Sequence, residues 1–527
     1  MTILGRVMLA FEGERLPDRV AARLAAAPAA GVTLFRHLNV RSPGQVRELT
    51  EALQRAASGG GAAAGPLLIA VDQEGGQFLA LGDESTPFAG NMALGAIDDE
   101  ALTEAVGAAI GTEARAMGVN VVYAPVLDIA SNPANPALGI RSFGDDPLAV
   151  ARHGAAMVRG LQGAGVAATV KHAPGKGDVA ADSHHGLARV DASRDVLDRR
   201  EFVPFRAVFA AGARLAMSGH VALPAVSGRD DLPSTLSRAV MTDLLRGDLG
   251  FAGVTISDAL DMRSLAQGPA QAVDVIAAVR AGVDLLLAAA DPQALDRIEA
   301  TLVAAAGRGL FAAAELEAAS ARVAALRVWI EAEGPAPSLD AVGSSANAAL
   351  AAEVARRSIT LVRDPGSRLP LRPGAGWGLL AVMPRPADLT PADTSSTVAP
   401  GLGAALRTRY EAVEDIVVEQ RPDAASIGAV AARAAAAGAV VVGTIDGHRQ
   451  PEQLALVEAI AATGVPIVAV ALRGPWDVGR YPAGVTALAT YSILPGSLDA
   501  LAAVLAGEAM PEGRLPVRVP GAAPARA

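Results

Sequence analysis

Residues 170–187 place several chemically reactive side chains close together in the chain. Lys171 and His172 end an apolar run, and Asp182 and His184 follow after a loop rich in glycine and proline. The same stretch holds both lysines of the chain and three of its seven histidines. A solvated surface loop is the alternative, but this gathering of scarce residue types favours a functional site.

Asp182 and His184 are two positions apart, and in an extended segment that spacing puts both side chains on one face. Histidine can give and take a proton near neutral pH. A neighbouring carboxylate fixes the tautomer of the ring and raises its basicity. The spacing predicts that Asp182 and His184 act together as a general acid and base, with the adjacent His185 pointing the other way.

Asp258 directly follows the apolar run 253–257. An aspartate that is ionised near neutral pH can attack an electrophilic carbon as a nucleophile. Alternatively, Asp258 caps a helix that begins at Ala259. We expect Asp258 to act as a nucleophile.

Short apolar runs alternate with amphipathic helical segments through roughly the first 330 residues. The predicted strands are 31–35, 66–71, 119–126, 166–170, 215–217, 253–257 and 283–287, and clear helical patterns cover 45–57, 100–117 and 147–164. Such alternation indicates parallel strands with helices outside them. The fold class is therefore α/β.

Polar side chains follow the carboxyl ends of these strands: Asp72, Asp128, Lys171, His172, His220 and Asp258. Active sites of (β/α) barrels collect at that end. A doubly wound open sheet would also bind ligands at strand ends, but at least five strands contribute here and no Gly-x-Gly-x-x-Gly fingerprint is present. We predict a TIM-type (β/α) barrel.

Several of these residues can form hydrogen bonds with a polar ligand. Lys171 and His172 supply hydrogen-bond donors, and Asp72 can accept from two adjacent hydroxyls. The planar fork of Arg141 can hold two oxygens, or it can form a weak surface pair with Asp145 or Asp146. For His220, core-lining and substrate-facing positions are both open.

A change of composition near residue 333 marks a second domain. We predict a barrel domain at 1–332, a linker rich in Gly and Pro at 333–345, and a smaller α/β sandwich at 346–527. At 527 residues, a chain of two or three domains is expected.

Composition excludes several classes of function. The net charge of −10 and the lack of a basic stripe argue against nucleic acid. The absence of cysteine excludes thiolate metal sites and disulfides. No paired metal ligands lie on one helix, so we expect neither metal nor cofactor. No signal peptide or membrane-length apolar run is recognised, which predicts a cytoplasmic protein with no membrane partner. We expect a monomer or a homodimer.

The motifs resemble those of glycoside hydrolase family 3, in particular its bacterial β-N-acetylglucosaminidases. Eight pieces occur in family order: VDQEGG (71–76), FAGNMALG (88–95), YAPVLD (123–128), SNPANP (131–136), RSFG (141–144), KHAPG (171–175), DSH (182–184) and ISD (256–258). The resemblance implies a barrel enzyme that removes β-linked N-acetylhexosamine from non-reducing ends with retention, small carbohydrates being its substrates. Recycling of cell-wall fragments is plausible by family analogy alone.

The resemblance also assigns roles to residues. It places the nucleophile at Asp258, the acid/base pair at His184 and Asp182, and sugar contacts at Asp72, Arg141, Lys171 and His172. Retaining hydrolysis needs such a nucleophile and proton donor.

Two departures from the family pattern affect the pocket. The loop that commonly reads Pro-Gly-His-Gly has Lys176 at its third position, and residues 77–81 lack the usual arginine. Lys176 could contact an anionic group of the substrate, or favour phosphate as the acceptor. A β-N-acetylglucosaminide phosphorylase and a non-catalytic carbohydrate-binding homologue are therefore the alternatives to a hydrolase.

Overall fold

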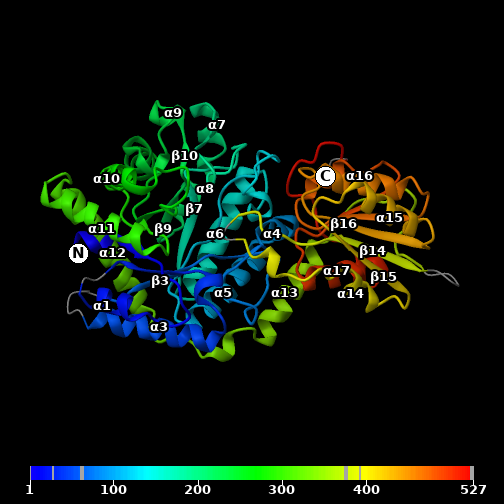
Figure 1. Ribbon diagram of the computed structural model, residues 1–527, viewed down its shortest axis with the longest axis horizontal. Helices are drawn as coiled ribbons and strands as arrows, with labels where there is room; N and C mark the ends of the chain where they lie inside the picture. The colour runs from blue at the N-terminus through cyan, green and yellow to red at the C-terminus, as the bar shows by residue number, and fades with distance from the viewer. Residues whose placement is uncertain (1, 27–28, 60–64, 373–377, 391–392, 523–527) are drawn as a thin grey trace.

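The computed structural model describes residues 2–26, 29–59, 65–372, 378–390 and 393–522. A barrel domain and a smaller sandwich domain lie side by side (Figure 1). Helix α12 (Ala313–Ala332) is the last helix of the barrel part, and α13 (Ser345–Ser358) is the first long helix after it. In the described part of the chain, no helix is both long enough and apolar enough to cross a membrane.

Eight parallel strands form a nearly closed barrel, which confirms the predicted fold class. Their order is β11-β9-β7-β6-β3-β2-β1-β12. A parallel bridge between Ile256 and Leu285 connects the two edges. The strands are β1 (Val7–Leu9), β2 (Gly31–Leu34), β3 (Leu68–Val71), β6 (Val121–Val122), β7 (Ala167–Ala173), β9 (Leu215–Ser218), β11 (Val254–Ser257) and β12 (Leu286–Leu287).

Seven of these strands match predicted runs, and β1 was missed. It lies in the apolar run 7–11, which is as long as the predicted run 31–35, so the length of the run did not set it apart. Of the strand predicted at 119–126, only Val121–Val122 form a paired strand, β6. It stops after Val122, and Pro125 has no amide hydrogen to donate.

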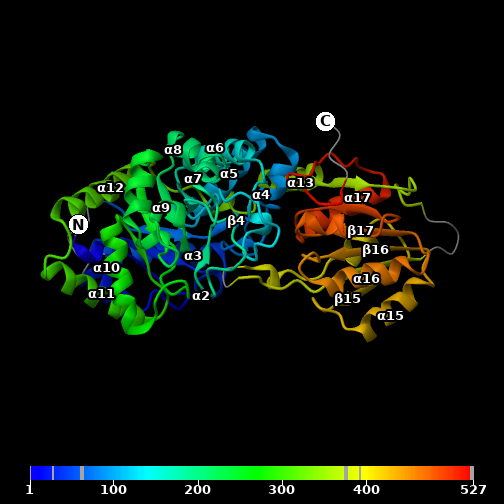
Figure 2. The same ribbon diagram turned by 90° about the horizontal axis from the view of Figure 1, so that it is seen from above.

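Helices surround the barrel (Figures 1 and 2). They include α1 (Asp18–Ala26), α3 (Pro43–Ser58), α5 (Glu100–Ala116), α6 (Pro147–Gly163), α8 (Phe202–Ala210), the π-helix η4 (Ala239–Asp248), α10 (Gln271–Ala281) and α11 (Pro292–Gly307). The three helices predicted from periodicity are present as α3, α5 and α6. Asp146 begins α6 by accepting a hydrogen bond from the Leu148 amide, with Pro147 in the first turn, as helix starts prefer.

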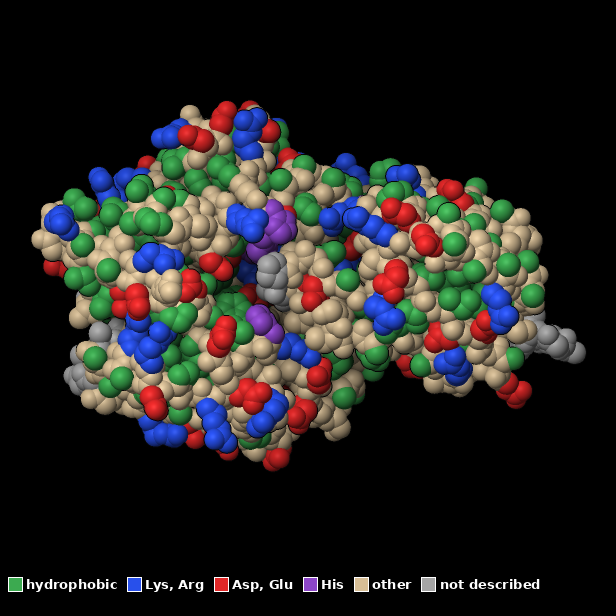
Figure 3. All heavy atoms as spheres, viewed as in Figure 1, with side chains coloured by type: hydrophobic (Ala, Val, Ile, Leu, Met, Phe, Trp, Pro, Cys, Tyr) green, Lys and Arg blue, Asp and Glu red, His purple; other side chains and the backbone are tan. Residues whose placement is uncertain are grey.

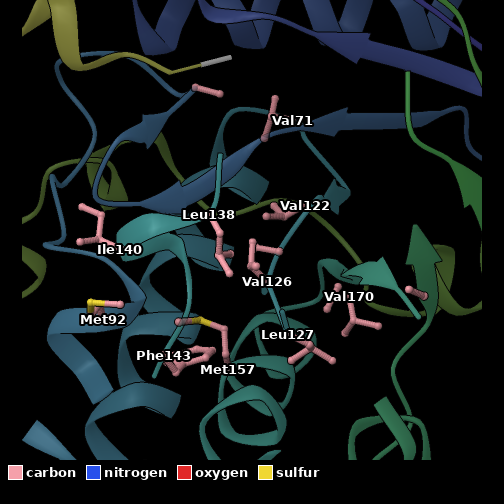
Figure 4. Close-up of a cluster of buried hydrophobic side chains, with 14 of the residues drawn as sticks. Val71, Met92, Val122, Val126, Leu127, Leu138, Ile140, Phe143, Met157 and Val170 are labelled. Atoms are coloured by element: carbon pink, nitrogen blue, oxygen red, sulfur yellow. The ribbon is translucent and has the colours of Figure 1, made fainter. Parts of the chain in front are cut away.

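The barrel core packs between the strands and these helices. Figure 4 shows Val71, Val122, Val126 and Val170 from the barrel strands and their ends in one buried cluster with Met157 of α6. All are almost completely buried. The core fixes the strands, and the strand ends in turn position the polar side chains that follow.

The sandwich domain has helices on both faces of a six-stranded sheet. Its order is β13-β18-β17-β16-β14-β15, parallel except for β13 against β18. The strands are β13 (Thr360–Arg363), β14 (Leu379–Pro384), β15 (Val413–Val418), β16 (Ala439–Thr444), β17 (Ile467–Ala471) and β18 (Thr486–Ala489). Alternate residues of β16 face opposite layers. One layer contains α13, α14 (Leu402–Arg407) and α17 (Pro495–Ala506), and the other contains α15 (Ala424–Ala434) and α16 (Pro451–Ala461).

Hydrogen bonds connect the two domains. Gln77 of the barrel donates from Nε2 to Asp393 Oδ2 (3.0 Å) and accepts from the Thr394 amide (2.8 Å). His448 donates to Asp477 Oδ1 (2.8 Å) and to the Pro133 carbonyl of the barrel (3.1 Å). Burial lowers the pKa of His448, but the hydrogen bond and charge of Asp477 outweigh it and raise that pKa above its ordinary value. The charged ring thus holds a sandwich loop against a barrel loop.

Candidate active site

A cavity of about 880 Å³ opens at the carboxyl ends of the barrel strands. In Figure 3, histidine side chains border a hollow on this face of the barrel domain. Seven of the nine predicted site residues line the cavity: Asp72, Arg141, Lys171, His172, Lys176, His184 and Asp258. Asp182 supports His184 from behind, and His220 does not line the cavity.

A buried ionic network holds one wall of the cavity. Arg141 donates from Nε and Nη2 to the two oxygens of Glu74, at 2.9 and 2.8 Å. Lys171 Nζ lies 2.6 Å from Glu74 Oε1 and also pairs with Asp72. Burial raises the pKa of Glu74, but Arg141 and Lys171 outweigh it and lower that pKa to about 2. Glu74 is therefore ionised and neutralises part of the positive charge in the wall.

This network alters the expectation for Arg141. Its planar fork holds the Glu74 carboxylate, its Nη1 donates to the Ala137 carbonyl, and its guanidinium stacks over Phe78 at 4.3 Å. The surface pair with Asp145 or Asp146 is not formed. Sequence reasoning missed Glu74, although its spacing of two from Asp72 after a strand was a signal that both face the same side.

We expect Glu74→Gln to destabilise the protein strongly. The change leaves Arg141 and Lys171 buried with too little negative charge, which typically costs about 3–5 kcal/mol. The wild-type pKa of about 2 lies below the ordinary 4.5, so the contribution is complete above pH 4.5 and is lost as the pH falls towards 2. Urea denaturation at several pH values measures both effects.

Glu51→Gln is the matched control for this measurement. Glu51 pairs with Arg47 on the exposed surface of α3. Such pairs contribute about 0–1 kcal/mol. Equal losses in the two variants would contradict a structural role for the buried Glu74 pair.

Asp128 anchors the strand end that carries His172. It is fully buried, and its Oδ2 accepts from His172 Nδ1 at 2.7 Å while its Oδ1 accepts from the Lys176 amide at 2.8 Å. Burial and nearby cations hold the pKa of His172 well below its ordinary value. The ring is therefore neutral, with its proton on Nδ1 and an acceptor at Nε2, which Arg141 approaches at 3.5 Å.

Asp258 lies at the end of β11 beside the ammonium group of Lys176. Its Oδ1 accepts from the Ala259 amide (2.9 Å), and its Oδ2 is 3.7 Å from Lys176 Nζ. Burial raises the pKa of Asp258, but the nearby positive charge outweighs it and lowers that pKa. No helix begins at Ala259, since the next one, η5 (Gly268–Ala270), starts later. The capping interpretation of Asp258 is therefore wrong.

Lys176→Met is expected to shift the acid limb of kcat/KM to higher pH. Without the ammonium group the pKa of Asp258 rises, so the carboxylate becomes protonated at a higher pH. An opposite charge at this range is worth about 1–3 pH units. The pH profile of kcat/KM measures the shift. Lys176→Arg keeps the charge, and an equal shift in both variants would contradict this electrostatic role.

Asp182 and His184 meet as predicted, but not through an extended segment. The chain forms a turn in which the His185 amide donates to the Asp182 carbonyl (3.0 Å). Asp182 Oδ1 accepts from both the amide and the Nδ1 of His184, at 2.9 and 2.6 Å. Burial raises the pKa of Asp182, but these hydrogen bonds lower it to about 2. The carboxylate is thus ionised and fixes the His184 ring, with Nε2 as its remaining nitrogen.

The turn also changes the expectation for His185. In an extended chain successive side chains alternate, but in this turn His184 and His185 both line the cavity. His37 lines it as well. His153 is buried in α6, where it stacks on Phe143 and bonds Thr103 (2.8 Å), so it belongs to the core.

Among the described residues, no group of three or more His, Asp or Glu side chains is arranged to hold a metal ion. The cavity instead presents a carboxylate, a carboxylate–imidazole pair and a lysine. This set can attack a carbon centre and transfer a proton to and from oxygen.

Comparison with known proteins identifies the class of protein. The Glycosyl hydrolase family 3 N terminal domain matches residues 7–326. The chain therefore belongs to glycosyl hydrolase family 3, and it is a glycoside hydrolase.

Individual relatives show which members of the family this chain is similar to. The chain is similar to "Beta-hexosaminidase A" of Pseudoalteromonas piscicida, with 30% identity over 96% of this chain and 91% of the relative. A "Beta-hexosaminidase" of Alkalilimnicola ehrlichii is 36% identical over 56% of this chain and 84% of its own. A solved family 3 β-N-acetylglucosaminidase from Paenibacillus sp. str. FPU-7 superposes with a TM-score of 0.91 and 34% identity, covering 98% of each chain.

Proposed function

We propose that this protein is a retaining exo-β-N-acetylhexosaminidase that removes β-linked N-acetylglucosamine from non-reducing ends. The observation that carries the proposal is one cavity lined by Asp258 and by His184, the latter held by Asp182. The relatives named for hexosaminidase activity support the sugar. Cytoplasmic recycling of cell-wall fragments remains part of this proposal.

In the first step, Asp258 attacks the anomeric carbon from the face opposite the leaving group. The C1–O bond breaks, and the Nε2 proton of His184 transfers to the departing oxygen. Asp182 stabilises the imidazolium before the transfer because its ionised carboxylate accepts from Nδ1. The low pKa of Asp258 keeps it ionised for the attack.

In the second step, the neutral His184 takes a proton from water, which attacks the anomeric carbon as Asp258 departs. Two inversions give net retention. Asp72, Arg141, Lys171, His172 and Lys176 form the wall that binds the sugar in this proposal. Because the Arg141 fork already holds Glu74, while Lys171 has a third N–H beyond its pairs with Glu74 and Asp72, we assign most hydroxyl contacts to Asp72 and Lys171.

The test is release of 4-nitrophenol from 4-nitrophenyl β-N-acetylglucosaminide, with the product anomer followed by NMR. We expect the β-anomer to form first. An α-anomer as the first product would exclude the retaining mechanism, and no release from this or other β-hexosaminides would exclude the function.

A phosphorylase is the second candidate, and Lys176 is the observation that favours it. A buried ammonium group close to Asp258 could hold a phosphate that attacks the glycosyl-enzyme in place of water. The same assay with and without inorganic phosphate distinguishes a phosphorylase from a hydrolase. Phosphate-dependent turnover with formation of a sugar 1-phosphate would move the assignment to phosphorylase. Sugar binding without turnover would favour a non-catalytic homologue.

A further inference from the structure

His220 lies two residues after the end of β9. It is fully buried and, in the described structure, does not line the cavity. Its Nδ1 is 2.7 Å from Thr235 Oγ1, and its Nε2 is 3.1 Å from the Ala259 carbonyl oxygen. Both ring nitrogens are therefore engaged by the protein, so the ring is not free to contact a sugar.

The partners of His220 determine its tautomer. A carbonyl oxygen only accepts hydrogen bonds, so Nε2 must carry the proton. Burial lowers the pKa of His220 and favours the neutral ring, so Nδ1 accepts from the Thr235 hydroxyl. Thr235 Oγ1 in turn accepts from the hydroxyl of Ser218 at 2.8 Å. The hydrogen bonds thus run in one direction, from Ser218 through Thr235 and His220 to Ala259.

The chain of hydrogen bonds ends on the residue that orients Asp258. The Ala259 amide donates to Asp258 Oδ1 at 2.9 Å, while its carbonyl accepts from His220. The Asp258 amide donates to the Ser218 carbonyl at 3.2 Å. No helix follows Asp258 immediately, so helical hydrogen bonds do not fix this backbone. His220 and β9 hold it, together with the Met262 amide, which donates to the same Ala259 carbonyl (3.2 Å), and the Leu260 amide, which donates to the Leu287 carbonyl (3.0 Å).

We propose that His220 is a positioning residue for the nucleophile: through Ala259 it fixes the rotamer of the Asp258 carboxylate for in-line attack on the anomeric carbon. This inference rests on the proposed retaining mechanism. Of the two positions left open for His220, the structure shows the buried one, so its role in this proposal is indirect. Attack geometry is sensitive, since a misplacement of about 1 Å can cost about 10²-fold in rate.

Two substitutions distinguish the hydrogen bond that Nε2 donates from the packing of the ring. In His220→Gln the side-chain amide can reach the position of Nε2 and donate to the Ala259 carbonyl. In His220→Asn it reaches only the position of Nδ1, so the carbonyl loses the side-chain donor and keeps only the Met262 amide (3.2 Å). Both variants remove the ring and its packing, which makes each the control for the other.

We expect His220→Asn to lower kcat by about 10²-fold with little change in KM, and His220→Gln to recover most of that loss. Stopped-flow measurement with a dinitrophenyl glycoside should place the loss in the glycosylation step, where Asp258 attacks. Thr235→Val should lose part of the activity, and Thr235→Ser should keep it because the hydroxyl remains.

The outcomes separate this inference from the proposed function. If the wild type shows no retaining turnover, the proposed function fails and the inference with it. If the wild type is active and both His220 variants lose activity equally, His220 is only structural. The same conclusion holds if the variants mainly raise KM or mainly lower the midpoint of thermal unfolding. If His220→Asn keeps wild-type kcat, the positioning role is wrong.

Discussion

Asp258→Ala is expected to lower kcat by about 10⁴-fold or more, which is typical of removing a covalent nucleophile. Without the carboxylate no glycosyl-enzyme can form, while the network around Glu74 and the His184 turn remain in place. KM should change much less than kcat, because the wall proposed to bind the sugar is intact. Steady-state release of 4-nitrophenol measures both constants.

Added azide provides a sharper test of the same role. The small anion fits where the carboxylate was removed and can attack the anomeric carbon from that face. The C1–O bond breaks, and the product is the α-glycosyl azide. NMR identification of that product would establish that Asp258 acts at the anomeric carbon. Rescue without an α-azide would contradict the nucleophile assignment.

Asp261→Asn is the matched control, since Asp261 also lines the cavity three residues further along the chain. We expect Asp261→Asn to lower kcat far less than Asp258→Ala does. Comparable loss in both variants would mean that general negative charge in this cavity, and not a nucleophile at one position, supports turnover.

The barrel was predictable because its strands are apolar runs that end in polar residues. That pattern is local and survives in the sequence. The seven predicted strands and the helices α3, α5 and α6 follow from it directly. Strand β1 was not predicted, although it lies in the apolar run 7–11; its pairing with β2 and β12 identifies it as a barrel strand.

The candidate site was predictable as a set of residues that lie close together, but not as a network. Asp258, His184 and Asp182 could be named from motif and spacing. Arg141, in contrast, pairs with Glu74, which lies 67 positions away in the chain. The local motif offered Asp145 and Asp146 as partners. Pairings over that distance depend on which strand ends meet, and spacing within one segment cannot supply them.

The turn at Asp182 shows a second limit. The spacing of Asp182 and His184 suggested contact across an extended strand, and contact occurs, but the backbone reaches it by a turn in which Asp182 accepts from the His184 amide. Short polar side chains compete for such local hydrogen bonds. The same turn brings His185 to the cavity, so the correct pair came with an incorrect local conformation.

His184→Ala is expected to produce a loss of activity that depends on the leaving group. For a poor leaving group such as a sugar hydroxyl, the departing oxygen needs a proton, and general acid catalysis typically contributes about 10²–10⁴-fold. A dinitrophenolate leaves without protonation, so glycosylation with that substrate should be nearly unaffected. Comparing kcat/KM for nitrophenyl, dinitrophenyl and disaccharide substrates measures the dependence.

Asp182→Asn tests whether the carboxylate or only the hydrogen bond is needed. Asparagine can still accept from the His184 ring through its amide oxygen, but it carries no charge to stabilise the imidazolium. The fall in Asp182 pKa to about 2 shows how strongly the ring and backbone favour the charged form. We therefore expect Asp182→Asn to lose activity with the same leaving-group dependence as His184→Ala, but to a smaller extent. His185→Ala, the neighbouring histidine at the cavity, should show no such dependence. If it did, His185 and not His184 would be the proton donor, and the turn would serve to present the second ring instead of the first.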